Sequence, residues 1–357
     1  MELAQAAAGR TILPLRATSN LTTDFTTNLT TKSENGYHFE VCVVLPLSRW
    51  LMRAGGLALP LALAACAPSP PLARGPLPVV TTAVPITLFT RAVAGDCATV
   101  TPLIPSNLGP HDVQARPAAV AALAQAKVLV TNGLGLESYL GRLLETAENR
   151  RLLVIDTSRG VTPLTTGDQN SDHDHRHDHG TVNPHIWLDP LRAMQQVVTI
   201  RDGLAKADPQ CRAGYEQRAA TFIQQLQELH RDLGRQLQPY AGRTFVTLHD
   251  VTPYFAERYK LRGVVLVDVP EVNPSPADLQ RVATAVKASQ LQALLSEPQE
   301  GHRSFETLAA DLGVKISVFD PLETASEEAA RDPNYYLQTM RRNGANLVQA
   351  LGAPSLR

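Results

Sequence analysis

The fold and the site are both decided by residues 172–190, which read Asp-His-Asp-His-Arg-His-Asp-His-Gly-Thr-Val-Asn-Pro-His-Ile-Trp-Leu-Asp-Pro. Histidine alternates with acid in the first half, whereas the last histidine, His185, stands among apolar residues between two prolines. Imidazole is a common metal ligand, and short histidine-rich tracts are typical of metal binding. The stretch therefore predicts a structured metal site beside a flexible metal collector. The auxiliary ligands of the collector are His173, His175, His177 and His179.

Length and composition indicate a globular protein of more than one domain. The chain has 357 residues, which exceeds what one hydrophobic core usually covers. Its formal net charge of −1 does not indicate the basic surface that nucleic-acid binding requires. No apolar run approaches the roughly 20 residues that a membrane-spanning helix needs.

One shorter apolar run predicts export. Residues 52–65 carry Arg53 followed by an uncharged, Leu- and Ala-rich run. Such a run after basic residues is typical of a secretory signal peptide, although a short buried helix is an alternative. Its end, Leu-Ala-Ala followed by Cys66, resembles the bacterial lipobox, after which the cysteine is lipidated. The proline-rich continuation predicts a tether over 66–77, because proline cannot continue a helix. We expect a lipid anchor on Cys66 and a location in the periplasm or on the outer face of the cytoplasmic membrane.

The segment upstream of this signal is unexpected for an exported protein. Residues 18–32 are mostly Thr, Asn and Ser, which predicts disorder because too little apolar surface can be buried. We therefore expect translation to start at Met52, with 1–51 a disordered extension. Two cysteines, Cys97 and Cys211, remain beyond the signal, and the sequence leaves open whether they pair.

Beyond the tether, the residue pattern alternates between strands and helices in two separate stretches. Parallel sheets covered by helices on both faces are typical of such alternation. A long proline-free pattern over 210–237 separates the two stretches and predicts one helix that bridges them. The predicted fold class is α/β with two lobes, 78–208 and 239–357, joined by a rigid linking helix over 209–238. No glycine-rich phosphate-binding motif is present, so nucleotide binding is not indicated.

Four candidate metal ligands follow predicted strands. These are His111 after strand 99–104, His185 after strand 151–156, His249 after strand 244–248, and Asp320 after strand 314–319. In open α/β sheets, ligands bind beyond the carboxyl ends of strands, so facing lobes could enclose one ion between them. A lone loop histidine is more often a surface residue, and Asp320 followed by Pro321 could simply cap a turn. His230 and His302 are interpreted as non-ligands.

The donor set favours zinc. Three imidazoles and one carboxylate make a normal tetrahedral zinc site, whereas Mn²⁺, Mg²⁺ and Ca²⁺ prefer more oxygen ligands. Copper and nickel share the preference for nitrogen and stay open as alternatives. Imidazole must be neutral to bind a metal, so affinity is expected to fall as pH drops below about 6.5.

With these motifs in place, the chain resembles the cluster A-I solute-binding proteins of ABC importers, particularly their zinc-uptake branch. The second-ligand motif of that family is similar to residues 183–190, Asn-Pro-His-Ile-Trp-Leu-Asp-Pro. Gly109-Pro-His111 and Leu248-His-Asp250 resemble its first and third ligand turns. The segment 319–322, Phe-Asp-Pro-Leu, resembles the fourth, and 271–276 a characteristic turn.

The resemblance implies two lobes on a rigid helix, with Zn²⁺ bound between them by the four matching residues. It implies that the protein is not an enzyme. The protein is expected to be a monomeric binding component that delivers zinc to a membrane permease and its ATPase partner. Alternatives are a manganese or iron importer component, a cell-surface adhesin, and a zinc metallohydrolase. Asp320 argues against the hydrolase, because a fourth protein ligand leaves no position for an activated water.

Overall fold

The computed structural model describes residues 75–353 except 112, 114–115, 166–181, 268–272 and 299–302, together with two short strands near the N-terminus. These strands, β1 (Thr30–Lys32) and β2 (His38–Glu40), pair antiparallel within a separate unit that covers Met1–Pro71. They fall inside the segment predicted to be disordered, and their Thr and Phe residues favour extended backbone. The predicted signal peptide and Cys66 lie outside the described residues.

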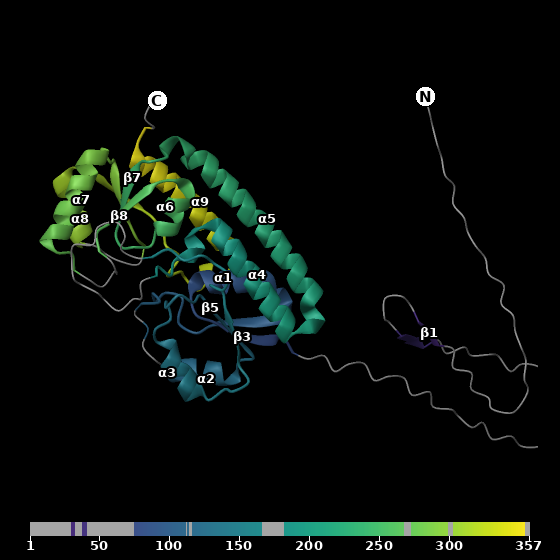
Figure 1. Ribbon diagram of the computed structural model, residues 1–357. Coiled ribbons are helices and arrows are strands. Elements are labelled where there is room, and N and C mark those ends of the chain that lie inside the picture. The colour runs from purple at the N-terminus through teal and green to yellow at the C-terminus, as the bar shows by residue number, and fades with distance from the viewer. Residues whose placement is uncertain are drawn as a thin grey trace, which may run out of the picture. The chain divides into compact units, whose positions relative to one another are not determined.

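The N-terminal lobe is built on a parallel sheet with the strand order β4-β3-β5-β6. Its strands are β3 (Leu77–Thr81), β4 (Ala98–Pro102), β5 (Val128–Thr131) and β6 (Leu153–Asp156). Its helices are α1 (Val84–Ala94), α2 (Pro117–Gln125), α3 (Leu140–Ala147) and α4 (Pro190–Ala207). Helices α1 and α4 lie on one face of this sheet and α2 and α3 on the other (Figure 1). Side chains alternate across the strands, so Val79 packs in the core that includes α1 and α4, while Val80 packs with α2 and α3.

The C-terminal lobe repeats this layout in a second parallel sheet, ordered β10-β9-β7-β8. Its strands are β7 (Thr244–Thr247), β8 (Arg262–Val265), β9 (Ala293–Ser296) and β10 (Lys315–Val318). Its helices are α6 (Pro253–Tyr259), α7 (Pro276–Ser289), α8 (Arg303–Leu312) and α9 (Asn334–Leu351). Ser275 and Asp278 form a reciprocal capping box that fixes the start of α7.

A 26-residue helix, α5 (Arg212–Leu237), runs along both lobes (Figure 1). Its buried side chains recur every three or four residues, which is the spacing of one helix face. They are Tyr215, Ala219, Phe222, Leu226, Leu229, Leu233 and Leu237. This face packs against α1 and α4 in one lobe and against α9 in the other. The predicted fold class of two α/β lobes with a long connecting helix is thus confirmed. No helix among the described residues combines the length and apolarity needed to cross a membrane.

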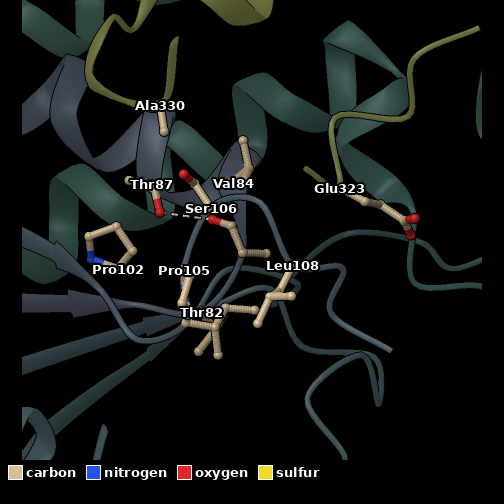
Figure 2. Close-up of a pocket in the computed structure, with 11 residues that line it drawn as sticks. Thr82, Val84, Thr87, Pro102, Pro105, Ser106, Leu108, Glu323 and Ala330 are labelled. Atoms are coloured by element: carbon tan, nitrogen blue, oxygen red, sulfur yellow. Dashed lines mark hydrogen bonds between the residues drawn. The ribbon is translucent and has the colours of Figure 1, made fainter. Parts of the chain in front are cut away.

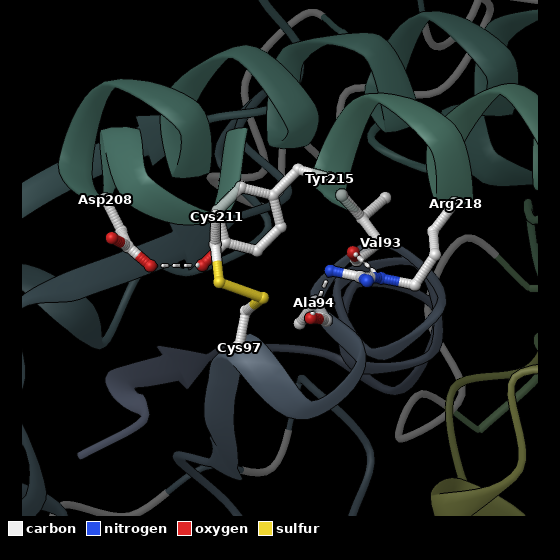
Figure 3. Close-up of a disulfide and its surroundings, with 7 residues drawn as sticks. All are labelled: Val93, Ala94, Cys97, Asp208, Cys211, Tyr215 and Arg218. Atoms are coloured by element: carbon white, nitrogen blue, oxygen red, sulfur yellow. Dashed lines mark hydrogen bonds between the residues drawn. A yellow bond between two sulfur atoms is a disulfide. The ribbon is translucent and has the colours of Figure 1, made fainter. Parts of the chain in front are cut away.

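Cys97 and Cys211 form a disulfide between the N-terminal lobe and the start of α5 (Figure 3). Cys97 ends the short 3-10 helix η1 (Gly95–Cys97), and Cys211 ends η3 (Pro209–Cys211). Arg218 of α5 reinforces the link by donating hydrogen bonds of 2.8 Å to the carbonyls of Val93 and Ala94. The sequence leaves this pairing open because the two cysteines are 114 residues apart. Packing of α5 on α1 brings them together.

Loss of this disulfide should destabilise the protein. We expect Cys97→Ser to lower the free energy of unfolding by about 2–4 kcal/mol, because the cross-link restricts a long loop in the unfolded chain. Denaturant unfolding of the metal-free protein, with and without reductant, measures the loss. The variant should be insensitive to reductant, and equal stability of wild type and variant would refute the assignment.

Candidate metal centre

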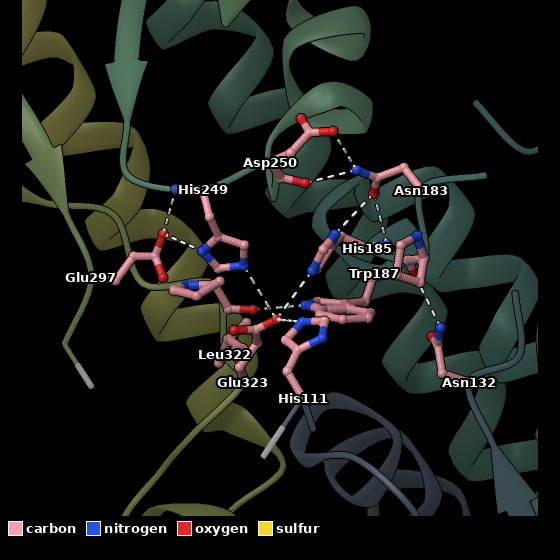
Figure 4. A network of polar contacts seen from close by, with 12 residues as sticks. His111, Asn132, Asn183, His185, Trp187, His249, Asp250, Glu297, Leu322 and Glu323 are labelled. Carbon is pink, nitrogen blue, oxygen red and sulfur yellow. Dashed lines mark hydrogen bonds and ion pairs between the residues drawn. The ribbon is translucent and has the colours of Figure 1, made fainter. Parts of the chain in front are cut away.

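Three of the predicted ligands come together where the two lobes face each other (Figure 4). His111 lies in the loop after β4, and His185 directly precedes the short helix η2 (Ile186–Leu188). His249 follows β7 by two residues. All three therefore lie beyond the carboxyl ends of parallel strands, the place where ligands bind in sheets of this kind.

The three imidazoles converge on one carboxylate oxygen, Oε1 of Glu323. Nε2 of His111 and Nε2 of His185 each lie 3.1 Å from it, and Nε2 of His249 lies 3.6 Å away. One ligand atom from each of the four residues lies within 4.8 Å of all the others. Three nitrogens and one oxygen at such spacing can contact a single ion placed between them.

These groups are withdrawn from solvent. His249 is 1% exposed, Glu323 3% and His185 4%, while His111 is partly exposed. Among the described residues, Nε2 of the buried His249 has no hydrogen-bond partner, since Oε1 of Glu323 lies 3.6 Å away. A buried polar atom without a partner is costly, so its direction toward the other three groups indicates a position for a ligand.

The second nitrogen of two rings is held by an acceptor. Nδ1 of His249 donates to Oε1 of Glu297 over 2.7 Å, and Nδ1 of His185 donates to Oδ1 of Asn183 over 2.9 Å. Because Nδ1 donates in both rings, Nε2 of each ring points to the centre of the cluster and can bind a metal once it carries no proton. Partners of this kind orient metal-binding histidines and increase their basicity.

Burial and the neighbouring charges set the protonation of the cluster. Burial lowers the pKa of His185 to about 4, although Glu323 acts in the opposite direction. Burial also lowers the pKa of His249, but the carboxylates of Glu297 and Glu323 outweigh it and hold that pKa well above the ordinary value. Burial raises the pKa of Glu323, but the histidines outweigh it and hold that pKa well below the ordinary value. At neutral pH the metal-free site therefore presents a neutral His185, a protonated His249 and an ionised Glu323, and a metal must displace the Nε2 proton of His249 in order to bind it.

The structure corrects the predicted fourth member of the cluster, because Glu323 and not Asp320 lies among the histidines. Oδ1 of Asp320 accepts from the backbone N–H of Leu322 at 2.8 Å, and Oδ2 accepts from the Tyr335 hydroxyl at 3.3 Å. Leu322 has a φ of 63°, a left-handed conformation in which the chain turns toward the site. Asp320 thus caps the turn that presents Glu323, which is the alternative that its position before Pro321 suggested.

The other predicted site residues lie elsewhere. His230, interpreted as a non-ligand, is on α5 with its ring 5.9 Å from that of Tyr259. The auxiliary histidines and His302 lie outside the described residues. Glu297, which binds Nδ1 of His249, is not among the predicted site residues. It directly follows β9, so the same placement after a strand that identifies the histidines also identifies Glu297.

Hydrogen bonds hold the lobes together around the cluster. Nε1 of Trp187 donates to the Pro321 carbonyl at 2.7 Å, and the Tyr336 hydroxyl donates to the Trp187 carbonyl at 2.6 Å. Arg258 of α6 binds both carboxylate oxygens of the buried Asp189 at 2.7 and 2.8 Å. The ring of Trp187 also contacts that of His185. The same side chain therefore joins the two lobes and helps to position a candidate ligand.

A small cavity lies beside Glu323 (Figure 2). Its volume is about 10 Å³, near the minimum that holds one water molecule. Polar lining comes from Thr82, Thr87 and Ser106. This cavity is too small for an organic substrate, and Glu323 is the one member of the cluster that lines it.

The chain is similar in sequence and in fold to several known proteins. A relative in Streptococcus pneumoniae (strain ATCC BAA-255 / R6), the zinc-binding lipoprotein AdcA, is 32% identical over 281 residues, which are 78% of this chain and 56% of AdcA. The chain thus spans little more than half the length of that relative. A crystal structure of ZnuA superposes with a TM-score of 0.65 at 30% identity, covering 76% of this chain and 99% of that one. Zn(II)-bound AdcA from Streptococcus pneumoniae gives a TM-score of 0.66 at 31% identity, covering 78% and 58%.

The family model described as zinc-uptake complex component A, periplasmic, matches residues 79–350. That range contains both four-stranded sheets except for the first two residues of β3, together with the linking helix and all four residues of the cluster. The chain therefore belongs to the ZnuA family of solute-binding proteins.

Proposed function

We propose that this chain is the extracytoplasmic solute-binding component of an ABC transporter, which captures Zn²⁺ between its lobes and delivers it to a membrane permease with an ATPase partner. The observation that carries the proposal is the convergence of three imidazole nitrogens and one carboxylate oxygen within 4.8 Å at the lobe interface. Family membership and the names of the relatives, a zinc-binding lipoprotein and a Zn(II)-bound structure, support the same cargo.

The donor set favours zinc over manganese or iron. His111, His185, His249 and Glu323 would bind the ion as three nitrogens and one oxygen, which is a closed tetrahedral set. Manganese prefers more oxygen ligands, and the carboxylate of Glu297 that could supply them is paired with His249. Four protein ligands also leave no open position for an activated water, so we propose binding without catalysis.

Two further parts of the chain extend the proposal. A lipid on Cys66 would anchor the protein through the tether 66–77 to the outer face of the cytoplasmic membrane, as the lipoprotein name of the relative supports. His173, His175, His177 and His179 would collect zinc for the main site, since imidazoles next to carboxylates attract divalent cations. The protein would act as a monomer. Its two lobes, 78–208 and 239–357, are joined through 209–238 and would enclose the ion between them.

Competitive metal titration tests the proposed function. The purified, metal-free chain should retain one tightly held zinc after dialysis, and excess manganese should not displace it. His249→Ala should abolish that retention, because it removes a buried nitrogen donor. Deletion of 172–179 should leave the tight site intact and remove only weaker, additional zinc. Retained manganese or iron, or no retained metal, would refute the proposal.

The fourth ligand is tested by a matched pair of isosteric changes. Glu323→Gln should raise the Kd for zinc by more than about 100-fold, beyond the 10–100-fold cost of losing an outer partner. Asp320→Asn keeps an acceptor for the Leu322 N–H and should cost less than about 10-fold. Isothermal titration against a competing chelator gives both constants. The opposite order of the two losses would return the ligand role to Asp320.

Membrane attachment is tested at the predicted lipidation site. Cys66→Ser should move the exported protein from the membrane fraction to the soluble fraction, because a serine cannot be lipidated. Cell fractionation with a quantitative immunoblot measures this distribution. An unchanged membrane fraction would rule out the anchor.

A further inference from the structure

Asn183 occupies a position between the two halves of the metal centre that the ligand set does not explain. It is 1% exposed and precedes His185 by two residues. Its side chain is aimed at His185 on one side and at Asp250 on the other (Figure 4). Asp250 belongs to the C-terminal lobe and directly follows His249.

The amide group uses both of its functions there. Oδ1 of Asn183 accepts from Nδ1 of His185 at 2.9 Å and from the His185 backbone N–H at 3.0 Å. Nδ2 donates to the Asp250 carbonyl at 2.7 Å and to Oδ2 of Asp250 at 3.1 Å. A primary amide offers an acceptor and two donors in one rigid plane, so rotation of one end moves the other.

We propose that Asn183 is a positioning residue that couples docking of the two lobes to the geometry of the metal site. Contact with Asp250 fixes the plane of the amide, and the amide oxygen fixes the ring of His185 with Nε2 toward the centre. Separation of the lobes withdraws Asp250, so His185 loses its fixed acceptor when the ion must leave. The inference rests on the proposed function, since it concerns how zinc is held and released.

Linkage makes the coupling reciprocal. If lobe docking strengthens zinc binding through Asn183, zinc binding strengthens lobe docking by the same free energy. The Tyr254 hydroxyl, which donates to the Asn183 carbonyl at 2.6 Å, adds a second contact between this residue and the C-terminal lobe. A partner that pulls the lobes apart would thereby weaken the site without contacting any ligand.

A donor–acceptor exchange tests the proposal on the full chain. Asn183→Asp keeps an acceptor for His185 but places a carboxylate against the carboxylate and carbonyl of Asp250. Zinc should then dissociate faster, with a Kd about 10–100-fold higher, the usual cost of a lost outer partner. Adding Asp250→Asn restores an amide–carboxylate pair in reversed order. It should bind zinc more tightly than Asn183→Asp alone but less tightly than wild type, because the new carboxylate still faces the backbone carbonyl of residue 250.

Competition with a fluorescent zinc chelator gives the rates and Kd, and thermal unfolding of the metal-free variants reports any purely structural loss. Asn346→Asp is the matched control, because its exposed amide also donates to a backbone carbonyl, that of Val318, away from the site. Wild-type zinc binding by Asn183→Asp, or no recovery in the exchanged pair, would overturn the proposal. The proposal would also be overturned if the loss of zinc affinity in each variant simply paralleled its loss of thermal stability.

Failure of this proposal can be distinguished from failure of the proposed function on which it rests. A wild-type chain that retains no zinc refutes the proposed function itself. If Asn183→Asp does not fold, the exchanged pair still decides, because the proposal requires it to fold and to bind zinc.

Discussion

The structure depends on one carboxylate, Glu323, that is buried between three imidazoles contributed by both lobes. A buried charge is costly unless it is paired, so Glu323 requires the lobes to be docked with the histidines in place. The two sheets supply that arrangement because the carboxyl ends of their strands face the same interface. The long helix and the disulfide then limit how far this arrangement can change.

Around that carboxylate, polar side chains orient the imidazoles and join the two lobes. Glu297 and Asn183 orient imidazoles, while Asn183 and Trp187 also join the lobes. Asp320 shapes the left-handed turn at Leu322 instead of contacting the cluster. The site is therefore a property of the interface, and neither lobe alone contains all four groups.

Much of this was predictable from local patterns. Alternating apolar segments predicted the two sheets, and placement after strands found His111, His185 and His249. The fourth ligand was predicted at the wrong residue because the strand pattern ends at Val318. Beyond it, the direction of the chain depends on hydrogen bonds that Asp320 makes with Tyr335 and Asn343, which lie far along the sequence. The sequence did not decide whether Cys97 and Cys211 pair for a similar reason, since only the packing of helices brings the two cysteines together.

Trp187 gives the centre an optical property. It is the only tryptophan in residues 67–357, since the other, Trp50, precedes Cys66. Its indole lies 5.2 Å from the His185 ring and donates to the Pro321 carbonyl across the interface. In a chain processed at Cys66, all indole emission therefore originates beside the cluster, so its intensity and wavelength report on the surroundings of His185 without any attached dye.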